Sequence, residues 1–183
     1  SMSFQVAEDG LDHQVAMPAA PDPDTLTSEQ DWGKLIADKV PEKMRDMLTR
    51  DRPIEIRPVD PMNPFKPEKR PPHRQNWFRA LGPLPDDPVL HRCLLTYASD
   101  FSFLGTSLTP HGRTFMSKNM QVASLDHAIW FHRDFRMDDW LLYDKDSPSA
   151  SAGRGFNRGN FFTRDGVLVA STTQEALIRE RKA

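Results

Sequence analysis

Apolar residues recur at helical spacing in two parts of the chain. The first part begins near Thr27, which stands three residues before Gln30 in the spacing of a capping box. Pro41 lies inside this pattern and predicts a kink or a break between two shorter helices. The apolar positions are Trp32, Leu35, Ile36, Val40, Met44, Met47 and Leu48. Their spacing predicts an amphipathic element that packs against the rest of the protein.

A second helix is predicted to begin at Asp87-Pro88. An acidic N-cap followed by proline at the first helical position suits the unpaired amides of a helix start. The apolar stripe that follows consists of Leu90, Cys93, Leu94, Tyr97, Phe101, Leu104 and Leu108. Its length and apolar character predict a central, buried helix.

Alternating patterns typical of strands cover most of the remaining chain. They span residues 53–59, 75–81, 120–132, 140–146, 155–164 and 167–178. Asp165-Gly166, between the last two, is a hairpin signal. One long helix among antiparallel strands predicts an α+β fold in which a curved sheet wraps around the helix, the hotdog arrangement. The pattern alone leaves open another α+β roll with the same order of elements.

Composition narrows the possible partners. The chain has 183 residues, with 24 Lys and Arg against 26 Asp and Glu. This balance predicts neither nucleic-acid nor membrane-surface binding. No apolar run approaches the roughly 20 residues of a membrane span. The single cysteine, Cys93, excludes an internal disulfide and fits a reducing compartment, so we expect a cytoplasmic protein.

Sequence signatures of common catalytic sites are absent, among them G-x-S-x-G, the P-loop and paired cysteines. Any chemistry must therefore come from dispersed polar residues. Asp100 lies at the edge of the second helix's apolar stripe, where partial burial would make its carboxylate a better base. The alternative is an acid that faces solvent or pairs with an arginine.

Two further candidates lie in predicted strands. Ser124 belongs to a strand with two apolar faces, which predicts that both faces are covered. Serine in a strand is usually a hydrogen-bonding filler. Gln174 shares a strand face with small residues, where its carboxamide can hold a water or a carbonyl oxygen. An ordinary polar residue of an edge strand is the alternative for Gln174.

Two other polar groups are weaker candidates. Asp126, His127, His132 and Asp134 are close in sequence, but alternating strand faces separate them, so no metal site is predicted. His127 fits a hydrogen-bonded buried imidazole. Arg154 and Arg158 lie among glycines that let a backbone approach closely, which suits a nucleotide phosphate. Plain surface charges on a twisted strand explain the same two residues.

Four segments resemble a known family. They are residues 97–101 (YASDF), 124–133 (SLDHAIWFHR), 152–156 (AGRGF) and 165–175 (DGVLVASTTQE). In this order they resemble the C-terminal hotdog domain of the type II acyl-CoA thioesterases, which are tandem double hotdogs. The resemblance implies that residues 1–5 are the tail of the last strand of a missing N-terminal hotdog. It further implies a linker with an amphipathic helix over residues 6–52 and the C-terminal hotdog domain over residues 53–183.

The resemblance also implies an active site made of Asp100, Ser124 and Gln174. Asp100 would deprotonate a water that Ser124 and Gln174 hold, and the water would attack the thioester carbonyl. Direct attack by Asp100 through an anhydride stays open. Backbone amides would stabilise the oxyanion. No cofactor and no metal are expected, and Arg154 and Arg158 would bind the phosphates of CoA.

The implied function is hydrolysis of fatty acyl-CoA to free fatty acid and CoA. The implied partners are the acyl-CoA substrate, the N-terminal hotdog half and further copies of the chain in a homo-oligomer. Two alternatives remain. An enoyl-CoA hydratase-like hotdog enzyme would use an Asp and a His, such as His127. A non-catalytic acyl-CoA-binding or assembly half would expose apolar surface.

Overall fold

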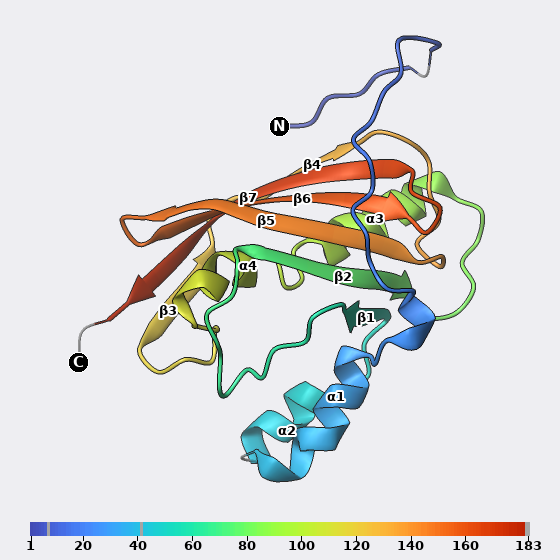
Figure 1. The fold of residues 1–183 in the computed structure, drawn as a ribbon. Coiled ribbons are helices and arrows are strands. Elements are labelled where there is room, and N and C mark those ends of the chain that lie inside the picture. The colour runs from blue at the N-terminus through green and yellow to red at the C-terminus, as the bar shows by residue number, and fades with distance from the viewer. Residues whose placement is uncertain (7, 41, 182–183) are drawn as a thin grey trace.

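The computed structural model describes residues 1–6, 8–40 and 42–181. Its strands form one seven-stranded antiparallel sheet in the order β1-β2-β5-β6-β7-β3, and β4 pairs with the other half of β7 (Figure 1). The strands are β1 (Ile54–Pro58), β2 (His73–Ala80), β3 (Met120–Ser124), β4 (Ala128–Phe131), β5 (Leu141–Ser151), β6 (Arg154–Thr163) and β7 (Leu168–Glu180). The helices are α1 (Glu29–Ile36), α2 (Glu42–Thr49), α3 (Pro88–Ser99) and α4 (Gly105–Leu108), with short 3-10 turns at Pro23–Thr25, Ala37–Lys39 and Thr109–His111. Within the described ranges, no helix is both long and apolar enough to cross a bilayer.

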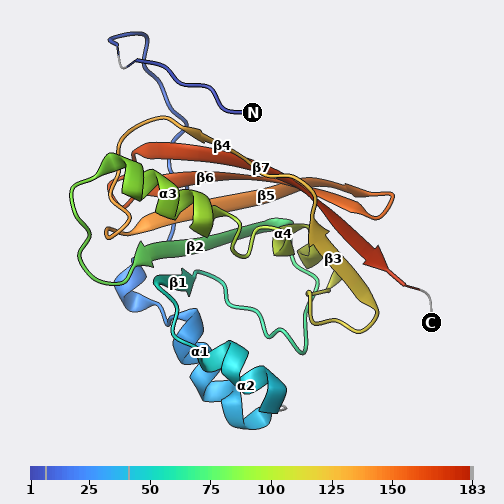
Figure 2. The same ribbon diagram turned by 180° about the vertical axis from the view of Figure 1, so that it is seen from behind.

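Helix α3 lies across one face of the sheet (Figure 2). Its Leu95 and Ala98 belong to the same buried cluster as Phe78, Tyr143 and Phe161 of the strands. The rings of Tyr143 and Phe161 stack with centroids 3.8 Å apart. Removing side chains of this size from water contributes about 1.5–3 kcal/mol each. The predicted α+β arrangement, a sheet wrapped around a helix, is confirmed.

The predicted start of α3 is confirmed, but its predicted end at Leu108 is wrong. Asp87 caps the helix by accepting a hydrogen bond from the backbone nitrogen of Val89 (2.9 Å). The helix ends at Ser99, and Ser102 adopts a left-handed conformation with φ of 56°. This turn directs Phe103 into the core, where it is fully buried.

The buried face of α3 also differs from the predicted stripe. Cys93 and Tyr97 of that stripe are exposed. The buried positions are His91, Leu95, Ala98 and Ser99. Small residues at 98 and 99 let the helix approach the sheet closely, whereas Tyr97 packs edge-to-face on Phe101 with centroids 4.9 Å apart.

The predicted strand over residues 120–132 is two strands, β3 and β4. Between them, the carboxylate of Asp126 accepts a hydrogen bond from the backbone nitrogen of Glu175 (2.7 Å). A side chain thus replaces a backbone acceptor of the β-ladder, and the alternation of faces is interrupted. Ser124 and Trp130 are exposed because both strands lie at the edge of the sheet. The expectation that both faces of this segment are covered is therefore wrong.

Two hairpins join the last three strands. The predicted hairpin at Asp165-Gly166 is confirmed, with Gly166 at a φ of 94°. A second tight turn at Ala152-Gly153, with φ of 50° and 74°, joins β5 to β6 and was not predicted.

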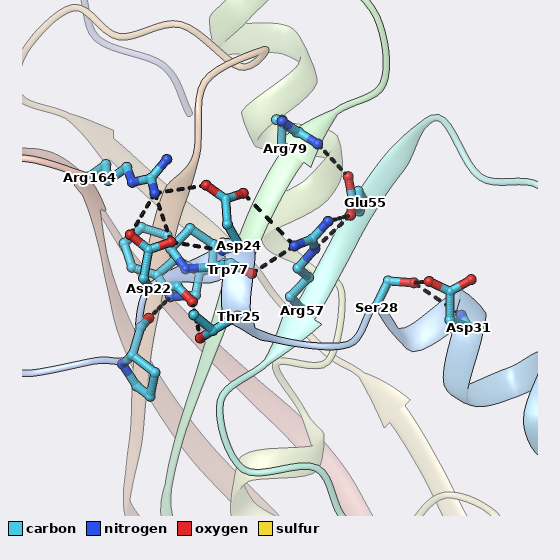
Figure 3. A network of polar contacts seen from close by, with 12 residues as sticks. Asp22, Asp24, Thr25, Ser28, Asp31, Glu55, Arg57, Trp77, Arg79 and Arg164 are labelled. Atoms are coloured by element: carbon cyan, nitrogen blue, oxygen red, sulfur yellow. Dashed lines mark hydrogen bonds and ion pairs between the residues drawn. The ribbon is translucent and has the colours of Figure 1, made fainter.

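Residues 11–26 form a strap on the face of the sheet opposite α3 (Figures 1 and 2). Apolar side chains of the strap and the sheet pack together: Met17, Ala20 and Leu26 against Trp77, Trp140, Leu142 and Phe162. Trp77 Nε1 donates a hydrogen bond to the carbonyl of Pro21 (3.0 Å), and Arg164 pairs with Asp22 and Asp24 (Figure 3). Residues 11–26 therefore cover apolar surface of the sheet. Residues 1–6 form no strand, and their assignment to another hotdog stays a prediction.

The N-cap of α1 is Ser28, one residue after the predicted Thr27. Ser28 Oγ accepts from the backbone nitrogen of Asp31 (3.0 Å) and donates to its carboxylate (2.8 Å), as Figure 3 shows. Two short helices replace one long helix, as predicted. Gly33 of α1 lets α2 approach closely, because a Cβ at this position would collide with the carbonyl oxygen of Leu48. Pro41 and the side chains of Met44 and Met47 lie outside the described residues.

Candidate active site

The three residues selected by the family resemblance meet at one point. Gln174 Nε2 donates a hydrogen bond to Asp100 Oδ1. Ser124 Oγ donates to the same oxygen at 3.3 Å. Among the described residues, no group hydrogen-bonds the other carboxylate oxygen, Oδ2, which is left for solvent. The structure therefore groups these side chains, and their catalytic roles stay a prediction.

Each of the three positions follows from the local fold. Asp100 is the C-cap of α3, where the chain turns. Ser124 ends β3 and pairs with Ala176, two residues along β7 from Gln174. Residues two apart on a strand share a face, so Ser124 and Gln174 both reach the side on which α3 lies.

The site has a buried floor and an open rim. Gln174 is fully buried, with 0% of its surface exposed. Asp100 and Ser124 are both exposed. The partial burial expected for Asp100 is therefore wrong for this chain, because the helix ends at Ser99 and releases the next residue to the surface.

His127 is a fourth member of this group of side chains. Strand alternation had placed it on the face opposite Ser124. Its Nε2 lies 2.8 Å from Ser99 Oγ, and its Nδ1 lies 3.3 Å from Gln174 Nε2. The break at residues 125–127 turns this ring inward. The predicted hydrogen-bonded imidazole is present, but spacing gave no signal that it touches the carboxamide.

The hydrogen-bond network assigns the proton on this imidazole. Ser99 Oγ donates its only proton to the carbonyl of Thr96 (2.8 Å), so His127 Nε2 carries a hydrogen and donates to Ser99. Nδ1 then accepts from Gln174. Burial lowers the pKa of His127, opposed by the charges of Asp100 and Asp126. A neutral ring thus fixes which way the Gln174 amide points.

The floor beneath Gln174 contains unpaired polar atoms. Among the described residues, Gln174 Oε1 has no hydrogen-bond partner. The same is true of both polar side-chain atoms of Asn157, which pairs directly with Gln174 across β6 and β7. Directly opposite residues on one face have neighbouring side chains. Unpaired buried amides cost stability.

Asp100 also lines a cavity of about 490 Å³. Most of its wall is apolar. The apolar lining side chains include Trp32, Ile36 and Leu48 from α1 and α2, and Phe101, Leu104 and Val122 from the hotdog part. The sequence did not predict that α1 and α2 would form one wall of a cavity at the site.

Lys145 of β5 supports the turn that follows Asp100. Its Nζ donates to Asn76 Oδ1 (2.6 Å) and to Ser102 Oγ (2.9 Å). The side chain is fully buried, and burial holds the pKa of Lys145 well below its ordinary value. Sequence inspection missed this residue because its strand neighbours are charged and read as a solvent-facing run.

Arg154 and Arg158 lie apart from this group. Arg154 pairs with Glu175 (3.3 Å), and Arg158 pairs with Asp146 (2.6 Å). Arg154 lines a groove of about 390 Å³ that also includes Lys69 and Arg113. Arg158 lines neither this groove nor the cavity at Asp100. In the part of the chain that the structure describes, no cluster of three His, Cys, Asp or Glu side chains could hold a metal.

This sheet and helix, with a carboxylate held by a carboxamide and a hydroxyl, define a hotdog-fold protein with a three-residue polar site. A hotdog-fold protein from Alicyclobacillus acidocaldarius superimposes with a TM-score of 0.67 at 18% identity, over 96% of this chain and 59% of the other, which supports the fold alone. An acyl-CoA thioesterase II from Mycobacterium marinum superimposes with a TM-score of 0.74 at 42% identity, over 97% of this chain and 61% of the other.

Residues 43–177 match the model of the family described as acyl-CoA thioesterase. The chain therefore belongs to the acyl-CoA thioesterase family. Acyl-CoA thioesterase 2 of Haemophilus influenzae is 41% identical over 97% of this chain and 62% of its own length. Acyl-coenzyme A thioesterase 8 of Homo sapiens is 36% identical over 97% of this chain and 57% of its own length. The chain thus spans about three fifths of the length of these relatives.

Proposed function

We propose that this protein hydrolyses acyl-CoA thioesters by activating a water molecule at Asp100. The observation that carries the proposal is the single carboxylate oxygen, Oδ1, that accepts hydrogen bonds from both Gln174 and Ser124. These bonds orient the carboxylate and leave Oδ2 to receive a proton. Membership of the acyl-CoA thioesterase family supports the substrate class.

The proposed reaction proceeds by direct attack of water, without a covalent acyl-enzyme intermediate. Water transfers a proton to Asp100 while its oxygen bonds to the thioester carbonyl carbon. The tetrahedral intermediate collapses, the carbon–sulfur bond breaks, and the thiolate of CoA takes the proton back from Asp100. The products are a carboxylic acid and free CoA. Ser124 and Gln174 orient the carboxylate with their donated hydrogen bonds. Ser124 Oγ keeps its lone pairs and can accept a hydrogen bond from the attacking water.

The geometry favours this hydrolysis over a hydratase reaction. A hydratase would need His127 to exchange a proton with the substrate. Both ring nitrogens of His127 are already engaged, one with Ser99 and the other with Gln174. We assign the ring a positioning role. The apolar cavity at Asp100 is the proposed place for the acyl chain.

A second hotdog half and a homo-oligomer are proposed partners. Apolar side chains near the site are exposed: Tyr97 by 56%, Leu125 by 53% and Trp130 by 52%. β3 and β4 form an open edge of the sheet beside them. Exposed apolar edges invite pairing with another chain segment. The longer relatives are consistent with such a half, and the same surface also fits the alternative of a non-catalytic assembly half.

Two further proposals come from the sequence. Arg154 and Arg158 are proposed to bind the phosphates of CoA, which would require them to exchange their present carboxylate partners. The groove shared with Lys69 and Arg113 supports Arg154 in this role. The cytoplasm is the proposed compartment, on the basis of the single cysteine.

The proposed function is tested by release of free CoA thiol from acyl-CoA, followed with a thiol-reactive chromophore. We expect Asp100→Asn to lower kcat by at least about 100-fold, because a general base typically contributes that much. Asp134→Asn is the matched control, since Asp134 is an exposed acid paired with Arg92 (2.8 Å). A wild-type rate in Asp100→Asn would remove Asp100 from the mechanism.

A further inference from the structure

Two positive side chains face each other beneath the cavity at Asp100. Arg74 of β2 and Lys145 of β5 are direct cross-strand partners. Both lie on the inward face of the sheet, because Asn76, two residues from Arg74, is buried and bonds Lys145. Like charges placed directly opposite in a sheet are destabilising. The arrangement therefore needs a compensating feature.

Lys145 is compensated within the protein. Its ammonium group donates to Asn76 and Ser102, and its side chain is fully buried. It cannot touch a ligand in the cavity, but it adds positive potential behind Arg74 whenever it is protonated.

Arg74 is not compensated in this way. It lines the cavity that includes Asp100. Among the described side chains and backbone groups, none accepts a hydrogen bond from its guanidinium, and no carboxylate lies within ion-pair distance. Glu29 lines the same cavity but pairs with Arg52 at 3.8 Å. Burial lowers the pKa of Arg74, Glu29 and Asp60 raise it, and Arg70 lowers it further.

Arg74 lies close to the turn that follows Asp100. Its Nη1 lies 3.7 Å from the point where a Cβ on Gly105 would stand. Gly105 opens α4, directly after the turn that begins at Asp100. The guanidinium therefore lies close to Gly105, in a cavity whose lining also includes Leu104 and Val122.

We propose that Arg74 binds an oxyanion of the acyl-CoA substrate inside this cavity, either a carboxylate on the acyl group or a phosphate of CoA. The inference rests on the proposed function. A guanidinium presents a rigid fork of donors that matches carboxylate and phosphate oxygens. Arg74 is half-buried, and a partly desolvated cation without a partner regains lost interactions when it binds an anion.

Three substrates distinguish the sources of the oxyanion. They are an acyl-CoA that ends in a methyl group, an acyl-CoA of equal length that ends in a carboxylate, and the methyl-ended acyl thioester of pantetheine, which has no phosphate. kcat/KM is measured for wild type, Arg74→Met and the control Arg92→Met, an exposed arginine that pairs with Asp134. Loss of one charged hydrogen-bonding group should lower kcat/KM by about 10- to 100-fold.

The pattern of rate losses in Arg74→Met identifies the position of the oxyanion or contradicts the proposal. If only the carboxylate-ended substrate loses rate in Arg74→Met, the oxyanion is on the acyl group. If both CoA thioesters lose rate and the pantetheine thioester does not, it is a phosphate. Equal losses on all three substrates, or no loss on any, would overturn the proposal. Arg92→Met should match wild type throughout.

Affinity measurements test the anion site at Arg74 independently of the proposed hydrolysis. Titration calorimetry measures the affinity of CoA and of free octanedioate for wild type and Arg74→Met. Weaker binding of either probe to the variant supports the anion site even if wild type releases no thiol. Unchanged affinity for both probes would overturn it. We also expect Arg74→Met to melt at the same or a higher temperature, because it removes a charge that has no partner; a lower melting temperature together with equal kinetic losses would indicate a purely structural arginine.

Discussion

Protonation of His127 should disable the site by turning the carboxamide of Gln174. The neutral ring accepts a hydrogen bond from Gln174 Nε2 through Nδ1 (3.3 Å), and the same amide nitrogen donates to Asp100. A protonated ring has a hydrogen on both nitrogens and can accept none. The amide would then turn its oxygen towards His127, which satisfies both groups and withdraws the donor from Asp100.

The size of this effect follows from the bond that is lost. A hydrogen bond to a charged group contributes about 1.5–3 kcal/mol. Since 1.4 kcal/mol corresponds to a factor of ten, we expect kcat/KM to fall by about 10- to 150-fold as the ring becomes charged. Burial lowers the pKa of His127 from its ordinary value of 6.5, so the fall should lie below pH 6.5.

The assay is thiol release from acyl-CoA between pH 5 and 8, a window set around the ordinary pKa of about 6.5. The comparison variant is His127→Gln, whose amide oxygen can accept from Gln174 and does not titrate. We expect the acid limb of wild type to move to lower pH in the variant. Identical profiles for the two proteins, or a rise in wild-type activity on acidification, would refute the reasoning.

The same ring should make folding stability depend on pH. The unfolded chain binds the proton near pH 6.5, and the native chain binds it only at lower pH. The free energy of unfolding should therefore decrease as the pH falls from 6.5 through the native pKa. Urea denaturation at several pH values should show a shallower decrease in His127→Gln.

Two further predictions concern packing and assembly. Asn157→Val should raise the free energy of unfolding by about 1–3 kcal/mol. The substitution replaces a buried amide that has no partner among the described residues with an apolar side chain of similar size. A lower melting temperature would mean that the Asn157 amide is satisfied by bridging to Gln174. The chain should also not behave as a lone compact monomer, because its open sheet edge and exposed apolar side chains favour association; light scattering that gave a single species of 20.9 kDa would contradict this.

Local chemistry in the sequence was sufficient for the elements whose signals are local. The N-cap at Asp87 and the hairpin at Asp165-Gly166 were predicted because each depends on a few neighbouring residues. Strand alternation also placed Thr172, Gln174 and Ala176 on one face of β7, and the structure shows that all three are buried. Family motifs, rather than spacing, selected Asp100 and Ser124.

The tertiary structure decided how those elements end and what they touch. α3 stops at Ser99, Ser102 takes a left-handed conformation, and Phe103 enters the core, an outcome that helical periodicity does not contain. His127 reaches Gln174 because Asp126 breaks the strand by bonding the backbone of β7. The cavity wall from α1 and α2 and the opposition of Arg74 to Lys145 also require the assembled chain. A sequence pattern specifies which surface of an element is apolar, whereas pairing between distant elements sets which polar atoms meet.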